Sequence, residues 1–263
     1  MLNCTPDSFY DGATLDGAAL VAKGLRLVEE GADIIDVGGE SSRPGAPGVS
    51  ATEEMARVLP VIAGLRQAGC RSISCDTRKA EVARAALEAG ATIINDISAG
   101  RDPAMFPLVA RAHCGYIAMH MQGEPATMQK DPVYSDVVAE VTAFLEKRTQ
   151  DLVALGARRQ DILWDPGIGF GKKPEHNLAL LRGLQRFTRL SRVCVGVSRK
   201  SLVAALSPAT GKDPGARLAG SLAALVPALR AGALCLRVHD VAATRQFLEI
   251  LRELAPDIMI PRP

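Results

Sequence analysis

Residues 33 to 40 read Asp-Ile-Ile-Asp-Val-Gly-Gly-Glu, and this stretch decides the fold because its pattern recurs along the chain. The apolar run at 33–37 predicts a buried strand, and a segment of helical period follows it. Similar runs lie at residues 71–75, 92–95, 115–119, 161–165, 193–197 and 234–238, and Met1 to Asn3 would be the clipped end of another. Eight strand–helix units predict an α/β fold, closed as a single (β/α)8 TIM barrel.

Length and composition agree with one soluble barrel. The 263 residues are close to the roughly 250 residues of such a barrel, so we expect one domain over residues 1–263. Gly31, Gly90 and Gly232 predict the ends of helices at 16–30, 79–89 and 216–231. A hydrophobic share of 48% excludes a disordered chain. No uncharged stretch approaches the ~20 apolar residues of a membrane-spanning helix, so we expect no membrane partner.

The charges and cysteines exclude other classes of protein. Lys and Arg total 31 against 29 Asp and Glu, which gives no broad positive field, so we expect no nucleic-acid partner. The six cysteines form no C-x-x-C pair and have no zinc-type spacing. We therefore expect reduced, mostly buried thiols. Because residues 1–7 also lack a signal-peptide pattern, we expect a cytoplasmic protein.

Polar side chains follow nearly every predicted strand. In a barrel of this kind the active site lies at the carboxyl ends of the strands, where these side chains would gather. Any one of them could instead cap a helix or form a turn. Together they form a candidate site, whose members are Asn3, Asp36, Gly38, Gly39, Glu40, Asp76, Asn95, Asp96, His120, Asp165, Ser198, Arg199, Lys200, Arg237 and His239.

The chemistry of these residues falls into two halves. Asp76, Asn95 and Asp165 offer two carboxylates and an amide to a planar, nitrogen-rich ring. Arg237 and His239 suit an anion, and barrels of this kind often bind phosphate near the seventh and eighth strands. Closure of the barrel would bring Asn3 beside them. Its amide oxygen could there help to hold Mg²⁺ on a diphosphate.

Two loops, at residues 3–12 and 38–48, are rich in turn residues and carry Phe9 and Arg43 at their tips. They are either mobile surface loops or lids over the site. We expect Met119 at the floor of the pocket and Met121 in the core. No H-E-x-x-H or G-x-S-x-G motif indicates a metalloprotease or a serine hydrolase.

From residue 3 to about residue 250, the chain resembles the dihydropteroate synthase family, and its motifs follow the family's order and spacing. These motifs are NCTPDSF at 3–9, GGESSRPGA at 38–46, Asp76-Thr77, NDIS at 95–98, MHM at 119–121, DPGIGFG at 165–171, SRKS at 198–201 and RVHD at 237–240. The resemblance implies a Mg²⁺-dependent transferase of folate biosynthesis. It would join 6-hydroxymethyl-7,8-dihydropterin diphosphate to p-aminobenzoate, giving 7,8-dihydropteroate and diphosphate.

The resemblance also implies a role for each matching residue. The catalytic group would be Asp76, Asp165, Lys200, Arg237 and His239. The pterin would be bound by Asp76, Asn95, Met119, Asp165 and Lys200. The diphosphate would be bound by Asn3, Arg237 and His239, with Asn3 also meeting the metal. The p-aminobenzoate pocket would be formed by Phe9, Ser42, Arg43, Pro44, Phe170 and Ser201, and the first mobile loop would contain Asp7 and Asp11.

Two questions stay open at this point. Ser42 stands where threonine is common in the family, so the chain is either a sulfonamide target or a sulfonamide-insensitive variant. One rival function is methyl transfer from methyltetrahydrofolate to a corrinoid, which needs the ring-binding carboxylates but not the first loop, SRK and RVH motifs together. The other rival is a protein that sequesters pterin without turnover. For an active enzyme we expect a dissociative substitution, and the resemblance implies a homodimer.

Overall fold

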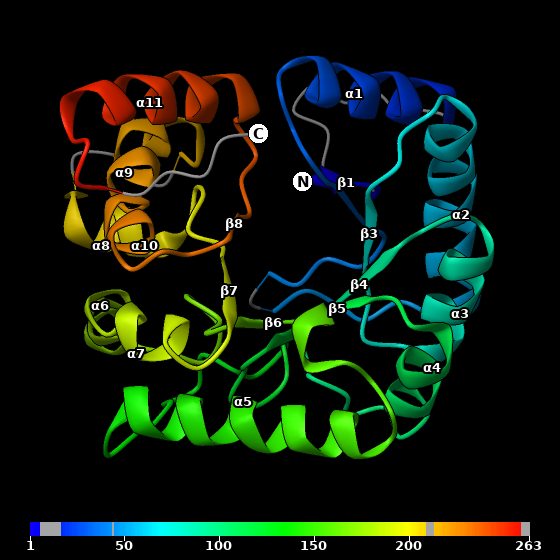
Figure 1. Ribbon diagram of the computed structural model, residues 1–263, viewed down its shortest axis with the longest axis horizontal. Coiled ribbons are helices and arrows are strands. Elements are labelled where there is room, and N and C mark those ends of the chain that lie inside the picture. The colour runs from blue at the N-terminus through cyan, green and yellow to red at the C-terminus, as the bar shows by residue number, and fades with distance from the viewer. Residues whose placement is uncertain (6–16, 44, 209–212, 259–263) are drawn as a thin grey trace.

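A computed structural model of the chain describes residues 1–5, 17–43, 45–208 and 213–258. Eight parallel strands form one curled sheet whose spatial order, β1 to β8, is the order of the sequence (Figure 1). The strands are β1 (Leu2–Asn3), β2 (Ile35–Gly38), β3 (Ile73–Asp76), β4 (Ile93–Asp96), β5 (Gly115–Met119), β6 (Ile162–Asp165), β7 (Arg192–Val195) and β8 (Cys235–Leu236). The predicted α/β barrel class is confirmed.

Helices between the strands surround the sheet and cover its outer face (Figure 1). They are α1 (Gly17–Glu29), α2 (Ala51–Gln67), α3 (Ala80–Glu88), α4 (Met105–Ala112), α5 (Val137–Ala154), α6 (Pro174–Arg182), α7 (Leu184–Thr188), α8 (Ser201–Leu206), α9 (Leu218–Ala223), α10 (Val226–Arg230) and α11 (Val241–Leu254). Short 3₁₀ turns lie at Arg159–Asp161 and Gly215–Arg217. Parallel strands covered in this way must be apolar on both faces, which explains the continuous Val and Ile runs in the sequence.

The predicted helix ends are confirmed, but one predicted helix is divided. Gly31, Gly90 and Gly232 have φ angles of 99°, 115° and 78°, the left-handed backbone that often ends a helix. The helix expected at 216–231 is instead a 3₁₀ turn followed by α9 and α10. Pro227 lies in the first turn of α10 and has no N–H to continue the preceding helix, so the break falls just before it.

The two ends of the sheet meet at a seam. No ladder of strand hydrogen bonds joins β8 to β1 within the described part of the chain. Instead, the ammonium of Met1 donates a hydrogen bond to the carbonyl oxygen of Val238 at 2.8 Å. Between the described residues of β1 and β8, the two ends of the sheet therefore meet through this contact and without a strand ladder.

Two further observations bear on the expected class of protein. None of the described helices combines the length and the apolar character needed to cross a membrane. All six cysteines are free thiols, and Cys4, Cys75 and Cys194 are buried.

Candidate active site

The register of the sheet gathers the predicted pterin-binding residues at one edge. Asp76, the last residue of β3, pairs with Gly38 on β2 and with Asn95 on β4. Across the next strands, Met119 at the end of β5 pairs with Asp165 at the end of β6. Because all these strands are parallel, the residues lie at the carboxyl ends of the strands, where sites form in barrels.

Arg237 joins the two halves of the predicted site. It follows β8 and donates from Nε to Asp36 Oδ2 at 2.6 Å and from Nη2 to Asp76 Oδ2. Asn95 donates to the same oxygen of Asp36 at 3.4 Å. The sequence suggested a ring-binding half and a separate anion-binding half. The curvature of the sheet instead brings the end of β8 against β2 and β3, so the two halves share this ion-pair cluster.

The ion pairs of this cluster set its protonation. Burial is the main reason that the pKa of Asp76 rises from 3.8 to about 7; Arg237 lowers it and Asp36 raises it. Burial alone would lower the pKa of Arg237, but the two carboxylates raise it, so the guanidinium stays charged. Asp76 therefore gains or loses a proton near neutral pH while it faces Arg237.

Asp165, at the end of β6, and Lys200, directly before α8, face the site. Asp165 is 4% exposed, and its Oδ1 accepts a hydrogen bond from the N–H of Gly167 at 2.7 Å. Burial raises the pKa of Asp165, against the lowering effect of Lys200 and of this N–H. Lys200 donates to the carbonyl of Ile168, and burial lowers its pKa to about 8, while Asp165 raises it. The pair offers an acceptor and a donor to a bound ring.

His239 is placed against the turn that follows β7. Ser198 Oγ lies 3.0 Å from His239 Nδ1 and accepts a hydrogen bond from the His239 N–H at 3.2 Å. The pKa of His239 is lowered to about 3, mainly by burial and also by the charges of the Met1 amino group, Arg237 and Arg199. The imidazole is therefore neutral near pH 7. It would meet a phosphate as a hydrogen-bond donor, and Arg237 supplies the positive charge.

Part of the predicted p-aminobenzoate pocket lies beside this cluster. Ser42 lines a small hollow together with Asp76 and Thr77. Arg43 is exposed, and its N–H donates to Ser41 Oγ at 3.4 Å. The other predicted residues on the first two loops lie outside the described residues: Asp7, Phe9, Asp11 and Pro44.

The remaining pocket residues lie near Lys200. Phe170 is buried, and Lys200 Nζ lies 4.7 Å from the centre of its ring. Phe170 packs in a small apolar cluster, apart from the main core, with Ile97, Met119, Met121 and Met128. Met121 is buried in this cluster, as expected of a core residue, and Met119 is buried beside it. That Met119 forms the floor of the pocket stays a prediction. Ser201 is exposed and lines a neighbouring cavity of about 450 Å³.

Lys172 is a buried residue that the sequence reasoning did not identify. Its side chain donates to the carbonyls of Phe170 at 2.9 Å and His120 at 3.2 Å, and its Nζ lies 3.0 Å from His120 Nδ1. Burial lowers the pKa of Lys172 to about 7, whereas Asp165 raises it. Lys172 thus ties the loop after β6 to the end of β5. The sequence feature that could have identified Lys172 is its position directly after the DPGIGFG motif.

The turn within that motif depends on glycine. Gly167 has a φ of 68°, and a Cβ atom there would lie 1.9 Å from the carbonyl oxygen of His120. A larger residue would be strained by its backbone and would collide with β5. Gly167 therefore allows the loop after β6 to approach close enough for Lys172 to reach His120.

Asn3 is the predicted metal ligand. It ends β1, pairs with Gly38 on β2 and is half-buried. Within the described residues, no group of three or more His, Cys, Asp or Glu side chains could hold a metal ion. A single amide oxygen nevertheless fits Mg²⁺ on a diphosphate, because this ion keeps most of its waters and needs few protein ligands.

Comparison with known sequences gives the family. The family model described as pterin binding enzyme matches residues 1–239. A dihydropteroate synthase of Haemophilus influenzae is 42% identical over 259 residues, which cover 97% of this chain and 92% of the relative.

Two solved structures are similar along nearly the whole chain. The dihydropteroate synthase of Xanthomonas albilineans with 4-aminobenzoic acid has a TM-score of 0.90 and 45% identity, and the match covers 99% of this chain and 92% of that one. The enzyme of Yersinia pestis in a sulfonamide drug complex has a TM-score of 0.91 and 38% identity, with 97% and 92% covered. The resemblance found in the motifs is thereby confirmed, and the chain belongs to the dihydropteroate synthases of the pterin-binding enzyme family.

Proposed function

We propose that this chain joins 6-hydroxymethyl-7,8-dihydropterin diphosphate to p-aminobenzoate, forming 7,8-dihydropteroate and diphosphate for folate biosynthesis. The observation that carries this proposal is the convergence of Asp76, Asn95, Asp165 and Arg237 at one edge of the sheet. A member of this family needs two things to bind this substrate. It needs hydrogen-bond acceptors for the pterin and a cation for the diphosphate.

The strand-end residues would bind the pterin by its polar edge. Asp76 and Asp165 would accept hydrogen bonds from ring and exocyclic N–H groups, beside the amide of Asn95. Lys200 would donate to the ring carbonyl, in the way that its Nζ donates to the backbone carbonyl of Ile168. Met119 would contact the face of the ring. Buried donors and acceptors of this kind favour a ring that pairs with all of them.

The reaction would be a dissociative substitution. The bond between the methylene carbon and the diphosphate oxygen breaks, and its electron pair leaves with the diphosphate. Asp76 and Asp165 would stabilise the positive charge that develops on the pterin, while Arg237 and His239 stabilise the leaving group. The amine of p-aminobenzoate then forms the new C–N bond and releases a proton. No activated nucleophile is needed, because the amine supplies its own lone pair.

Arg237 has two tasks in this scheme. Its guanidinium forms ion pairs with both Asp36 and Asp76. An arriving diphosphate would compete for the guanidinium, and a pterin N–H would take its place on Asp76. The two parts of the substrate would therefore favour each other's binding.

Mg²⁺ would be held by Asn3 together with diphosphate oxygens and water, and it would supply positive charge to the leaving group. Asp7 and Asp11 would lie in the first loop near this ion, and Phe9, Pro44 and Arg43 would lie over p-aminobenzoate. A sulfonamide would compete for the same pocket. A homodimer and a cytoplasmic location also remain predictions, and light scattering would measure the former.

The decisive test is turnover by the purified protein with Mg²⁺ and both substrates. We expect dihydropteroate and diphosphate in equal amounts, and Arg237→Met as a control should abolish both. A pterin-sequestering protein would instead bind the pterin tightly and release no diphosphate. That result would refute the proposed reaction.

A further inference from the structure

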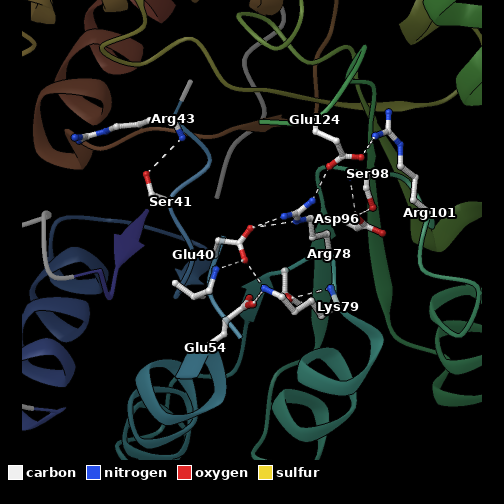
Figure 2. Close-up of polar contacts among 12 residues, drawn as sticks. Glu40, Ser41, Arg43, Glu54, Arg78, Lys79, Asp96, Ser98, Arg101 and Glu124 are labelled. Atoms are coloured by element: carbon white, nitrogen blue, oxygen red, sulfur yellow. Dashed lines mark hydrogen bonds and ion pairs between the residues drawn. The ribbon is translucent and has the colours of Figure 1, made fainter. Parts of the chain in front are cut away.

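Six charged side chains next to the site form one ionic chain, in the order Glu54, Lys79, Glu40, Arg78, Glu124 and Arg101 (Figure 2). Its charges alternate, three carboxylates against three cations, so the ionic chain is neutral as a whole. It connects α2 with the loops that follow β2, β3, β4 and β5. These loops surround the carboxyl ends of the strands, where the active site lies.

Glu40 is the centre of the ionic chain. Lys79 donates from Nζ to both Glu40 and Glu54. Arg78 donates from Nε to Glu40 Oε1 at 3.1 Å and from Nη1 to Glu124 Oε2 at 2.7 Å. Burial would raise the pKa of Glu40, but the hydrogen bond and charge of Lys79, together with Arg78, hold it below 4.5. Glu40 is therefore charged near neutral pH.

The inner end of the ionic chain is buried and the outer end is not. Glu54 is 0% exposed and the Glu40 side chain is 11% exposed, whereas the Glu124 side chain is 50% exposed. Buried ion pairs are costly to break because each partner left alone keeps an unpaired charge. Exposed pairs contribute little and are weakened by salt. The positional constraint therefore comes from the part around Glu40.

Glu40 stands at the base of the segment that carries Ser42 and Arg43. Its Oε2 accepts the N–H of Val49 at 3.4 Å, so the carboxylate also closes the segment from its far end. The tip is held separately, by a hydrogen bond of 3.2 Å from the N–H of Gly45 to the carbonyl of Pro125. The segment thus rests on neighbouring loops at both its base and its tip.

The partners of Glu40 are next to the pterin side of the site. Arg78 and Lys79 follow Asp76 and Thr77 directly in the chain. One small hollow is lined by side chains from both sides, namely Glu40, Ser42, Glu54, Asp76, Thr77, Arg78 and Ile97. A direct polar connection between the two sides therefore runs through Glu40.

We propose that Glu40 is a positioning residue for the transfer reaction. By binding Lys79 and Arg78, it fixes the p-aminobenzoate segment relative to Asp76, and so fixes the amine relative to the reacting methylene carbon. This inference rests on the proposed function. A misplacement of about 1 Å can cost on the order of 10²-fold in rate. In a dissociative substitution, a misplaced amine also lets water capture the carbon, which gives 6-hydroxymethyl-dihydropterin and diphosphate.

The test is Glu40→Gln in the full chain, with diphosphate and dihydropteroate measured in the same reaction. Wild type should release one diphosphate for each dihydropteroate. For Glu40→Gln we expect the KM for p-aminobenzoate to rise roughly tenfold, the Kd of the pterin to stay unchanged, and diphosphate to exceed dihydropteroate. A misfolded fraction lowers both products equally, so their ratio reports on positioning alone.

Two further variants sharpen the test. Glu53→Gln is the matched control, because Glu53 is an exposed neighbour of Glu54 that pairs with Arg57 outside the ionic chain; it should behave as wild type. Arg78→Gln removes one partner of Glu40 and leaves Lys79. We therefore expect a smaller rise in the KM for p-aminobenzoate and a smaller excess of diphosphate than in Glu40→Gln.

The outcomes separate the two claims. Equal amounts of diphosphate and dihydropteroate, with an unchanged KM for p-aminobenzoate, would overturn the positioning role if they are found in Glu40→Gln. Turnover by wild type in the same assay would still support the proposed function. Equal effects of Glu40→Gln and Glu53→Gln would also overturn it, because they would indicate a general disturbance of the loop. No dihydropteroate from wild type would refute the proposed function itself.

Discussion

Pterin binding should follow the proton on Asp76, whose pKa is about 7. A protonated carboxyl group cannot accept hydrogen bonds at both oxygens from an amidine-like edge. At pH 6 about one molecule in ten carries the charged form, because one pH unit is a tenfold change, or about 1.4 kcal/mol. We therefore expect 6-hydroxymethylpterin to bind about tenfold more weakly at pH 6 than on its plateau above pH 7.

Two substitutions should move this transition in opposite directions. Asp36→Asn removes a negative charge that raises the pKa of Asp76, so the transition should move to lower pH. Arg237→Gln removes the cation that lowers the pKa, so the transition should move to higher pH. Asp165 has a raised pKa as well, but Asp36 is not among the groups that shift it. A shift in Asp36→Asn therefore distinguishes Asp76 from Asp165.

The assay is a calorimetric titration of the protein with the pterin, without diphosphate, between pH 5 and pH 8.5. Each variant is measured below its melting temperature, which is determined separately, because Arg237→Gln leaves two buried carboxylates unpaired. An affinity that does not change over this range, or a shift of both variants in the same direction, would refute the reasoning.

Three other predictions concern binding and stability. Asp165→Ala should abolish pterin binding, whereas Phe9→Ala should mainly raise the KM for p-aminobenzoate. If the two variants weakened the use of pterin and of p-aminobenzoate equally, the separate roles of Asp165 and Phe9 would be contradicted. Gly167→Ala should lower Tm by several degrees more than Gly156→Ala, because both glycines have positive φ but a Cβ atom collides only at Gly167; equal melting temperatures would argue against the close approach to β5. The raised pKa of Asp76 means that its contribution to stability is full below about pH 4 and is lost as the pH rises through about 7. Between pH 5 and pH 8, the free energy of unfolding measured with urea should fall less in Asp76→Asn than in wild type. An equal fall in the two proteins would exclude Asp76 as the source of this pH dependence.

The apolar runs and the polar residues after them were sufficient to predict the strands and the edge where the site lies. Asp76, Asn95, Met119 and Asp165 each end a strand or lie next to its end, so their gathering follows from parallel strands alone. Their roles stay predictions from the family resemblance.

The contacts between distant segments could not be predicted. That Arg237 lies on Asp36 and Asp76 depends on how far the sheet curls, and no local pattern encodes the curl. Glu54 looks like an ordinary surface carboxylate in the first turn of a helix, yet it is buried against Lys79 from the next unit. Lys172 also looks like a surface residue, because the sequence does not show that its turn folds back on β5.

The methionine-rich cluster beside Phe170 would have a consequence for ligand choice under the proposed function. Met119, Met121 and Met128 have unbranched, rotatable side chains with polarisable sulfur atoms, which can refill space when a neighbour changes shape. A p-aminobenzoate pocket backed by this cluster would tolerate aryl groups of different outline better than one backed by branched residues. Selectivity among aromatic amines would then have to come from other parts of the pocket, such as the segment around Ser42.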